Sequence, residues 1–193
     1  IKTVNWVGGS TTNTVGTHCF GECSELTTIK GFGKITSVPD YCFFRCGKLT
    51  GITSSGKVLE NNGVTSLGKY CFAMCSVIGD VYLPTTVTSI GEGCFCCVPY
   101  LETKDSLPEN IDEFIRSDED RSQIISENAT GVREFRWGSD DINNPIIGTL
   151  GKCVFAGCNR MVVPWFNVLL RYQEGLNTAK DGIAPYTFLN CRG

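Results

Sequence analysis

Residues 83–95 read L-P-T-T-V-T-S-I-G-E-G-C-F, and the next three residues are C-C-V. The end of this stretch, G-C-F-C-C-V at 93–98, recurs as H-C-F-G-E-C at 18–23, Y-C-F-F-R-C at 41–46 and Y-C-F-A-M-C at 70–75, with steps of 23, 29 and 23 residues between copies. Internal repetition with a period of roughly 20 to 50 residues indicates a stack of similar structural units. The repeated motif therefore decides the fold class.

Two weaker copies of the motif follow, C-V-F-A-G-C at 153–158 and Y-T-F-L-N-C at 186–191. In these copies Val154 and Thr187 replace the first cysteine. A phenylalanine keeps its place in all six copies, at Phe20, Phe43, Phe72, Phe95, Phe155 and Phe188. The repeat thus extends over nearly the whole chain.

An apolar residue follows the motif and opens a short extended segment, at Leu26, Leu49, Ile78, Leu101 and Met161. The segments I-K-T-V-N-W at 1–6 and V-R-E-F-R-W at 132–137 have the same shape. Apolar residues at the first and fourth places, with polar residues between them, predict a short strand with one buried face. Each unit is therefore expected to contain a strand, a turn and a short helical or 3₁₀ return.

The full pattern, L-x-x-I-x-L-P-x-x-V-T-x-I-G-x-x-C-F-x-x-C, resembles the BspA-like leucine-rich repeat, and residues 83–95 match it almost position for position. The family usually has alanine in place of the first cysteine. The resemblance implies an α/β repeat fold, a leucine-rich-repeat solenoid of about seven rungs with a parallel sheet of short strands on one face. One domain, 1–193, would contain rungs at 1–25, 26–48, 49–77, 78–100, 101–131, 132–160 and 161–193.

Ile1 already occupies the first place of a strand, and the chain stops three positions before another strand would begin. Repeat stacks need their open ends covered. We therefore expect either that partners cap the ends or that the chain is a fragment of a longer protein.

Twelve cysteines, most of them inside the motif, leave three interpretations open. Cysteines four apart on one helical turn have Cβ atoms about 5–6 Å apart, whereas a disulfide needs about 3.5–4.5 Å, so a bridge within the motif would be strained. Core packing as free thiols is the first interpretation. A bridge between adjacent rungs is the second, and a zinc site is the third, although structural zinc favours closer cysteine pairs. We expect unpaired thiols, with no metal and no cofactor.

Composition and motifs argue against catalysis and several kinds of partner. The net charge of −3, without a basic cluster, argues against nucleic acid, and no apolar run reaches the roughly 20 residues of a transmembrane helix. His18 precedes Cys19, but sequence neighbours on a turn point in different directions, so a surface histidine is expected and not a catalytic pair. We predict that the chain is not an enzyme.

An acidic stretch interrupts the repeat between Glu102 and Glu127, with nine carboxylates against three bases. It lacks the spaced aspartates of a calcium loop, so an irregular solvated excursion over about 115–130 is expected. Asn128-Ala129-Thr130 is an acceptor pattern for glycosylation, which matters only in a secreted eukaryotic chain.

The resemblance implies a non-catalytic protein-binding or adhesion module with a partner protein or extracellular matrix as its ligand. It also implies a surface-displayed or secreted protein, and an intracellular location is not excluded by the sequence. The alternative is a structural subunit that tiles end to end. Partner-binding residues are expected in the outward fifth place of each strand, a column of Asn5, Lys30, Thr53, Tyr82, Asp105, Arg136 and Trp165, flanked by Lys2, Asp80, Glu102, Arg133 and Glu134. Aromatic and arginine side chains in such a row are typical of protein interfaces, although the row is also compatible with the plain solvated side of a sheet.

Overall fold

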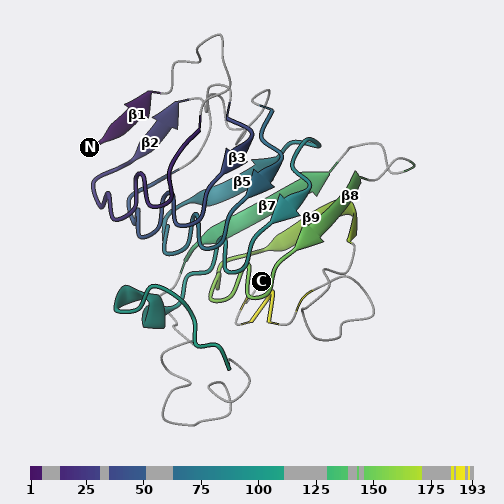
Figure 1. Ribbon diagram of the computed structural model, residues 1–193. Coiled ribbons are helices and arrows are strands. Elements are labelled where there is room, and N and C mark those ends of the chain that lie inside the picture. The colour runs from purple at the N-terminus through teal and green to yellow at the C-terminus, as the bar shows by residue number, and fades with distance from the viewer. Residues whose placement is uncertain are drawn as a thin grey trace.

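Short strands joined by turns make up the part of the chain that the computed structural model describes, residues 1–5, 14–30, 35–50, 63–110, 130–138, 143, 146–170, 184, 186–189 and 191 (Figure 1). A 3₁₀ helix, η1, spans Pro99–Glu102, and the described part of the chain contains no α-helix. The strands are β1 (Thr3–Asn5), β2 (Thr28–Lys30), β3 (Ser37–Val38), β4 (Ser66–Leu67), β5 (Gly79–Leu83), β6 (Ser89–Ile90), β7 (Val132–Gly138), β8 (Ile146–Leu150) and β9 (Val163–Leu170).

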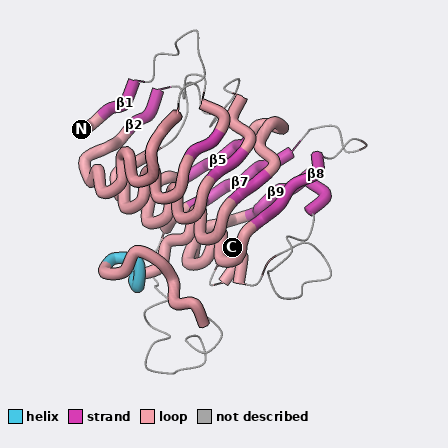
Figure 2. Tube along the Cα trace, in the orientation of Figure 1, coloured by secondary structure: helices cyan, strands magenta, loops and turns pink. Residues whose placement is uncertain are grey.

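The strands pair in parallel because each repeat unit follows the path of the one before it. β1 pairs with β2, while β3, β4, β6 and β8 form a second row and β5, β7 and β9 a third. β9 pairs with β7 along residues 163–167 and with β8 along 168–170, which joins the two longer rows into one seven-stranded sheet (Figure 2). The predicted parallel strands are confirmed, and a unit contributes strands on both sides of the motif.

The cysteine motif itself folds as consecutive tight turns and not as the helical return expected from the sequence. In the second copy, the N–H groups of Phe44 and Cys46 donate to the carbonyls of Tyr41 and Phe43, three residues back. The N–H of Phe43 donates instead to the carbonyl of Cys71 in the next unit, at 2.8 Å. Alternate N–H groups thus close turns and link units, as in a sheet.

Residues with a left-handed backbone in the turn segments explain why no helix forms. The first position of every motif copy has positive φ, and so does the fifth position of the first, second, third and fifth copies, for example +58° at Tyr41 and +57° at Arg45. A residue in this conformation ends a right-handed helix. The α part of the expected α/β class is therefore wrong for the described residues.

The motif phenylalanines stack into a column through the core. Their ring centroids lie 5.4, 5.2, 5.5, 5.8 and 5.5 Å apart in sequence order, with nearly parallel planes. Offset stacked rings at this separation attract one another beyond the area they bury. The repeated phenylalanine therefore fixes the register between units.

The second motif cysteine has a partner of its own in the unit before it. The thiols of Cys46, Cys75 and Cys158 lie 3.1–3.3 Å from the carbonyl oxygens of Phe20, Phe43 and Phe95, and donate to them. All twelve cysteines are free thiols. Nine of them are buried, at Cys42, Cys46, Cys71, Cys75, Cys94, Cys96, Cys97, Cys153 and Cys158. Core packing therefore describes most of the thiols.

Residues 99–110 leave the stack and pair with none of its strands. β5 pairs directly with β7, and the N–H of Phe95 donates to the carbonyl of Val154 at 2.9 Å. The strand expected to open at Leu101 is wrong, because this residue lies in η1 with proline at the helix start. Proline lacks an N–H for a strand ladder and is suited to the first turn of a helix.

Candidate functional site

Three residues of the expected partner-binding column stand side by side on the β5, β7 and β9 strands. Tyr82 is in register with Arg136, and Arg136 is in register with Trp165. The Arg136 guanidinium lies over the Tyr82 ring, 5.5 Å from its centroid. At the other end of the stack, Asn5 and Lys30 are also in register. The strand register thus aligns these five positions in two separate groups, one in the two-stranded sheet and one in the seven-stranded sheet.

For the two remaining positions of the column, Thr53 and Asp105, the outcome is different. Thr53 lies outside the described residues. Asp105 is not on a strand: it follows η1 and lies 3.4 Å from the guanidinium of Arg45, at the turns. The strand places expected for Asp105 and for the flanking Glu102 are wrong, because Glu102 lies in η1, Asp105 follows it, and β5 pairs directly with β7.

Ion pairs connect the charged side chains of this face, one between β5 and β7 and one within β7. Arg133 donates from Nε and Nη2 to the two carboxylate oxygens of Asp80, at 2.9 and 2.6 Å. This hydrogen bonding lowers the pKa of Asp80 and raises that of Arg133. Arg136 donates to Glu134 at 2.9 Å, so its guanidinium is held between a carboxylate and the Tyr82 ring. The face carries both signs of charge, already paired.

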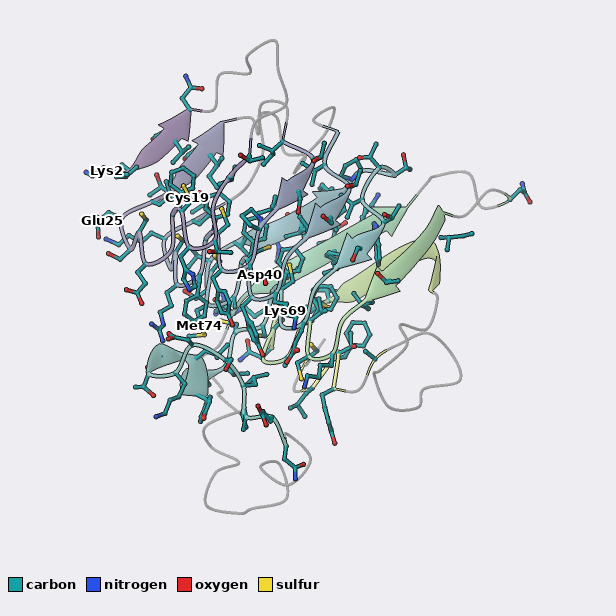
Figure 3. The ribbon with its side chains drawn as sticks, viewed as in Figure 1. Lys2, Cys19, Glu25, Asp40, Lys69 and Met74 are labelled. Atoms are coloured by element: carbon teal, nitrogen blue, oxygen red, sulfur yellow. The ribbon has the colours of Figure 1, made fainter. Side chains whose placement is uncertain are left out.

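A second surface, the outer side of the turn stack, carries apolar residues of its own. They are Phe44, Tyr70, Ala73, Cys96, Cys153 and Ala156, which point away from the phenylalanine column. Residues 98–107, here called the clasp, start at the last residue of the fourth motif copy and add three buried side chains to the same cluster, Val98, Leu101 and Leu107. Met74 packs at the edge of this cluster (Figure 3). The turns are thus sandwiched between two apolar layers.

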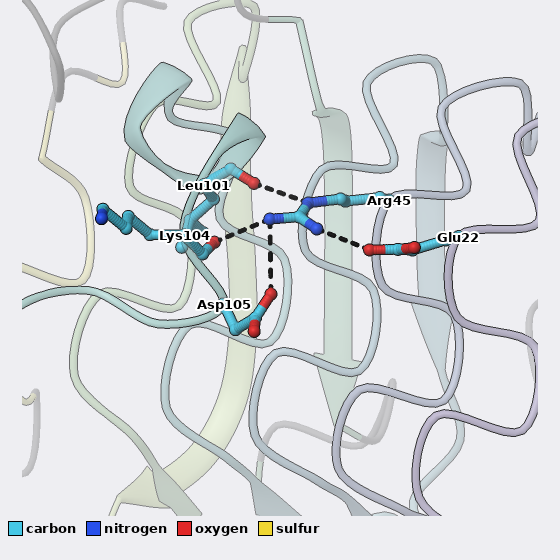
Figure 4. Close-up of polar contacts among 5 residues, drawn as sticks. All are labelled: Glu22, Arg45, Leu101, Lys104 and Asp105. Carbon is cyan, nitrogen blue, oxygen red and sulfur yellow. Dashed lines mark hydrogen bonds and ion pairs between the residues drawn. The ribbon is translucent and has the colours of Figure 1, made fainter.

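Arg45 fastens the clasp to the turns (Figure 4). Its Nε donates to the carbonyl of Leu101 at 2.8 Å and its Nη2 to the carbonyl of Lys104 at 3.0 Å. Its other side is held by Glu22, at 2.6 Å. Together with Asp105, these contacts use the fork of donors that only arginine offers.

A family model for the BspA type leucine rich repeat region matches residues 3–117, in six copies. The chain belongs to this family. No curated protein and no solved structure matches it. BspA-type repeats are commonly protein-binding or adhesion modules and are generally non-catalytic. No helix among the described residues is long and apolar enough to cross a membrane.

The stacking of this BspA-type chain continues past the matched residues. The backbone N–H of Phe95, in the fourth motif copy, donates to the carbonyl of Val154, and the N–H of Phe155 donates to the carbonyl of Thr187 at 2.9 Å. The motif copies at 153–158 and 186–191 therefore join the same ladder of turns as the matched copies.

His18 and Cys19 occupy the first turn segment of the BspA-type stack. The His18 ring stacks on Tyr41 at 4.5 Å, which continues to Tyr70 at 5.4 Å as a second aromatic column. Cys19, labelled in Figure 3, is exposed, whereas its equivalents Cys42 and Cys71 are buried. Cys19 stays exposed in the same motif place because no described unit covers it.

Sequence reasoning missed the clasp and Arg45, although one signal pointed to them. Tyr41, Tyr70 and Phe44 are aromatic residues at the first and fourth motif positions, which alternate with the inward cysteine and phenylalanine. Aromatic side chains on both sides of a turn segment indicate that something covers its outer side. The covering residues themselves had no periodic mark, because they lie outside the repeat.

Proposed function

We propose that this chain is a non-catalytic protein-binding module that recognises a partner protein or the extracellular matrix through the β5, β7 and β9 face. The placement of Arg136 carries the proposal: Glu134 and the Tyr82 ring hold its guanidinium, and Trp165 is its neighbour in register. Tyrosine, tryptophan and arginine dominate binding energy at protein interfaces. An arginine that is already fixed loses little conformational entropy when a partner docks.

We propose further that residues 1–193 form one leucine-rich-repeat solenoid domain, displayed at a cell surface or secreted. The parallel register between units and the continued ladder of turns support the solenoid. BspA-like repeats are typically found in surface or secreted proteins, which supports the location. Residues 99–110 would then begin an excursion between two directly stacked units.

Binding to a panel of purified extracellular-matrix proteins, measured by biolayer interferometry, tests the binding face. The double substitution Tyr82→Ala with Arg136→Ala should weaken binding of any ligand found by at least tenfold, since each interface anchor contributes about 2 kcal/mol or more. Trp165→Ala should act in the same direction.

A matched control lies on the other row of strands. Thr65 and Thr88 are exposed beside β4 and β6, and each hydroxyl donates to a backbone carbonyl of the neighbouring unit. Thr65→Ala with Thr88→Ala should leave affinity unchanged. Equal losses of affinity in the two double variants would contradict the proposal that this face binds the ligand. Full affinity in a folded Tyr82/Arg136 variant would contradict it as well.

End-to-end assembly is a second candidate function, favoured by the exposure of the first turn segment. Cys19 is exposed and Cys23 half-buried, whereas a stacked unit buries the equivalent thiols of the second and third copies. A neighbouring molecule placed there would bury them too. Light scattering across a concentration series separates the two functions, because a tiling subunit gains mass with concentration and a recognition module does not.

A further inference from the structure

The clasp is attached to the turns through side chains, outside the backbone ladder that joins the repeat units. Its polar attachments include the two carbonyl oxygens held by Arg45 and the N–H of Leu107, which donates to the Tyr70 hydroxyl at 3.3 Å. The Arg45–Asp105 pair adds a contact at the solvent, where ion pairs contribute little. Val98, Leu101 and Leu107 add buried apolar contacts.

The backbone of the clasp bonds to itself. Leu101 donates to Val98, and Thr103 and Lys104 donate to Tyr100, while no described clasp N–H donates to a backbone carbonyl of the turns. Beneath it, the turns keep their own ladder, for example from Tyr70 to Glu92 at 2.8 Å. Lifting the clasp would therefore break no hydrogen bond of the stack. Segments of this kind open with less free energy than global unfolding requires.

We propose that residues 98–107 open and close over the turns as a unit, independently of the stack, with Arg45 as the latch. Opening uncovers the apolar outer strip around Phe44 and Tyr70, together with two thiols, Cys96 and Cys153. Both cysteines are buried when the clasp is closed and share one apolar cluster with its three buried side chains. The clasp thereby controls access to a second apolar surface, on the opposite side of the turns from the phenylalanine column.

The cysteines supply probes that distinguish clasp opening from unfolding. Cys96 and Cys153 belong to the cluster under the clasp, whereas Cys94 and Cys97 belong to the central core with the phenylalanine column. Cys96 and Cys97 are sequence neighbours that face different clusters. A local opening exposes the first pair, and global unfolding exposes all four.

Pulsed alkylation with N-ethylmaleimide under native conditions, followed by mass spectrometry of each cysteine, measures the opening. Arg45→Gln keeps most of the stem but loses the charged fork, so it should accelerate labelling of Cys96 and Cys153 by about tenfold, the effect of 1.4 kcal/mol on the opening equilibrium. Labelling of Cys94 and Cys97 should stay unchanged. Rates are compared as variant against parent at each cysteine, which cancels differences in thiol reactivity.

The matched control is Arg133→Gln, which removes an arginine–carboxylate pair on the strand face. It should leave all four labelling rates unchanged. If Arg45→Gln does not fold, Leu107→Ala replaces it, because this change removes one buried clasp side chain without touching the turns. The proposal is overturned if the labelling rates of all four cysteines change by one common factor in the folded variant, or if the labelling rates of Cys96 and Cys153 do not change.

Discussion

The Sγ atoms of Cys71 and Cys94 lie 3.4 Å apart, in adjacent units of the buried core. A disulfide requires about 2.05 Å between sulfurs, so the two thiols are in contact without a bond. Burial, and secondly the hydrogen bond with Cys94, raises the pKa of Cys71 well above its usual range. Because only the thiolate attacks in disulfide chemistry, these groups are protected from oxidation by their surroundings.

The first prediction is that all twelve cysteines remain reduced in purified protein. Titration with a thiol reagent in denaturant, without reductant, should give twelve thiols per chain. A count of six or fewer would mean that stacked cysteines of adjacent units are bridged and that the core is an oxidised framework. The same titration on reduced protein provides the reference value.

The second prediction is a loss of stability at alkaline pH. Burial raises the pKa of Cys97 to about 11 and that of Cys46 to about 12. In the unfolded chain both thiols ionise near pH 8.5, so above this value the folded state retains more protons than the unfolded state. Their contribution to stability is present below about pH 8.5 and is lost as pH rises toward 11 and 12.

Urea unfolding between pH 7 and 10.5, with reductant present, checks this prediction. Each such thiol lowers the free energy of unfolding by up to about 1.4 kcal/mol per pH unit in the window above pH 8.5. Cys97→Ser should make the decline shallower, because serine does not ionise there. A urea midpoint that stays constant from pH 8.5 to 10.5 would contradict the assignment of these buried thiols.

The third prediction concerns the close approach of backbones at Gly91. A Cβ added there would lie 2.6 Å from the carbonyl carbon of Gly68 and 2.7 Å from the nitrogen of Lys69, in the neighbouring unit. Backbone atoms in a packed ladder cannot move aside cheaply, so Gly91→Ala should lower the free energy of unfolding by about 1–3 kcal/mol.

Gly16→Ala is the control for this change, since nothing lies within 4 Å of the added Cβ. It should be neutral or stabilising by less than about 1 kcal/mol, because alanine restricts the unfolded chain. Urea midpoints measure both variants. Equal stability of the two alanine variants would show that the units are not packed as closely at Gly91 as the structure has them.

Repeat spacing predicted the features that the units share and failed where a contact outside the repeat decides the structure. The phenylalanine column and the register of Tyr82 with Arg136 follow from one residue recurring at one place. Leu101 has the spacing of a strand opener, yet it is one of the clasp side chains buried against the turns. Its position depends on Arg45, which lies 56 residues away in sequence. No local pattern records such a partner.

Positive φ at Tyr41 and Arg45 was equally invisible in the sequence. Tyrosine and arginine rarely adopt a left-handed backbone, and glycine or asparagine would have marked the turns. The N–H groups of both residues donate to carbonyls of the next unit, Lys69 and Ala73, at 2.9 Å. Hydrogen bonds between units therefore maintain the strained conformation, and these bonds exist only once the units are stacked.

The fourth prediction is that limited proteolysis cuts first within about residues 115–130, in the acidic stretch that interrupts the repeat. Residues 115–129 lie outside the described part of the chain, so the prediction rests on the sequence and on the stacking of the described units on either side.

The units on either side of the acidic stretch contact each other directly. β5 pairs with β7, and the N–H of Phe95 donates to the carbonyl of Val154. Both fragments of a chain cut in this stretch should therefore stay associated. Gel filtration of the nicked protein should give one native peak containing both fragments, which separate only in denaturant. Early cleavage within 78–100, or separation of the fragments under native conditions, would show that the units on either side of the interruption are not stacked directly on each other.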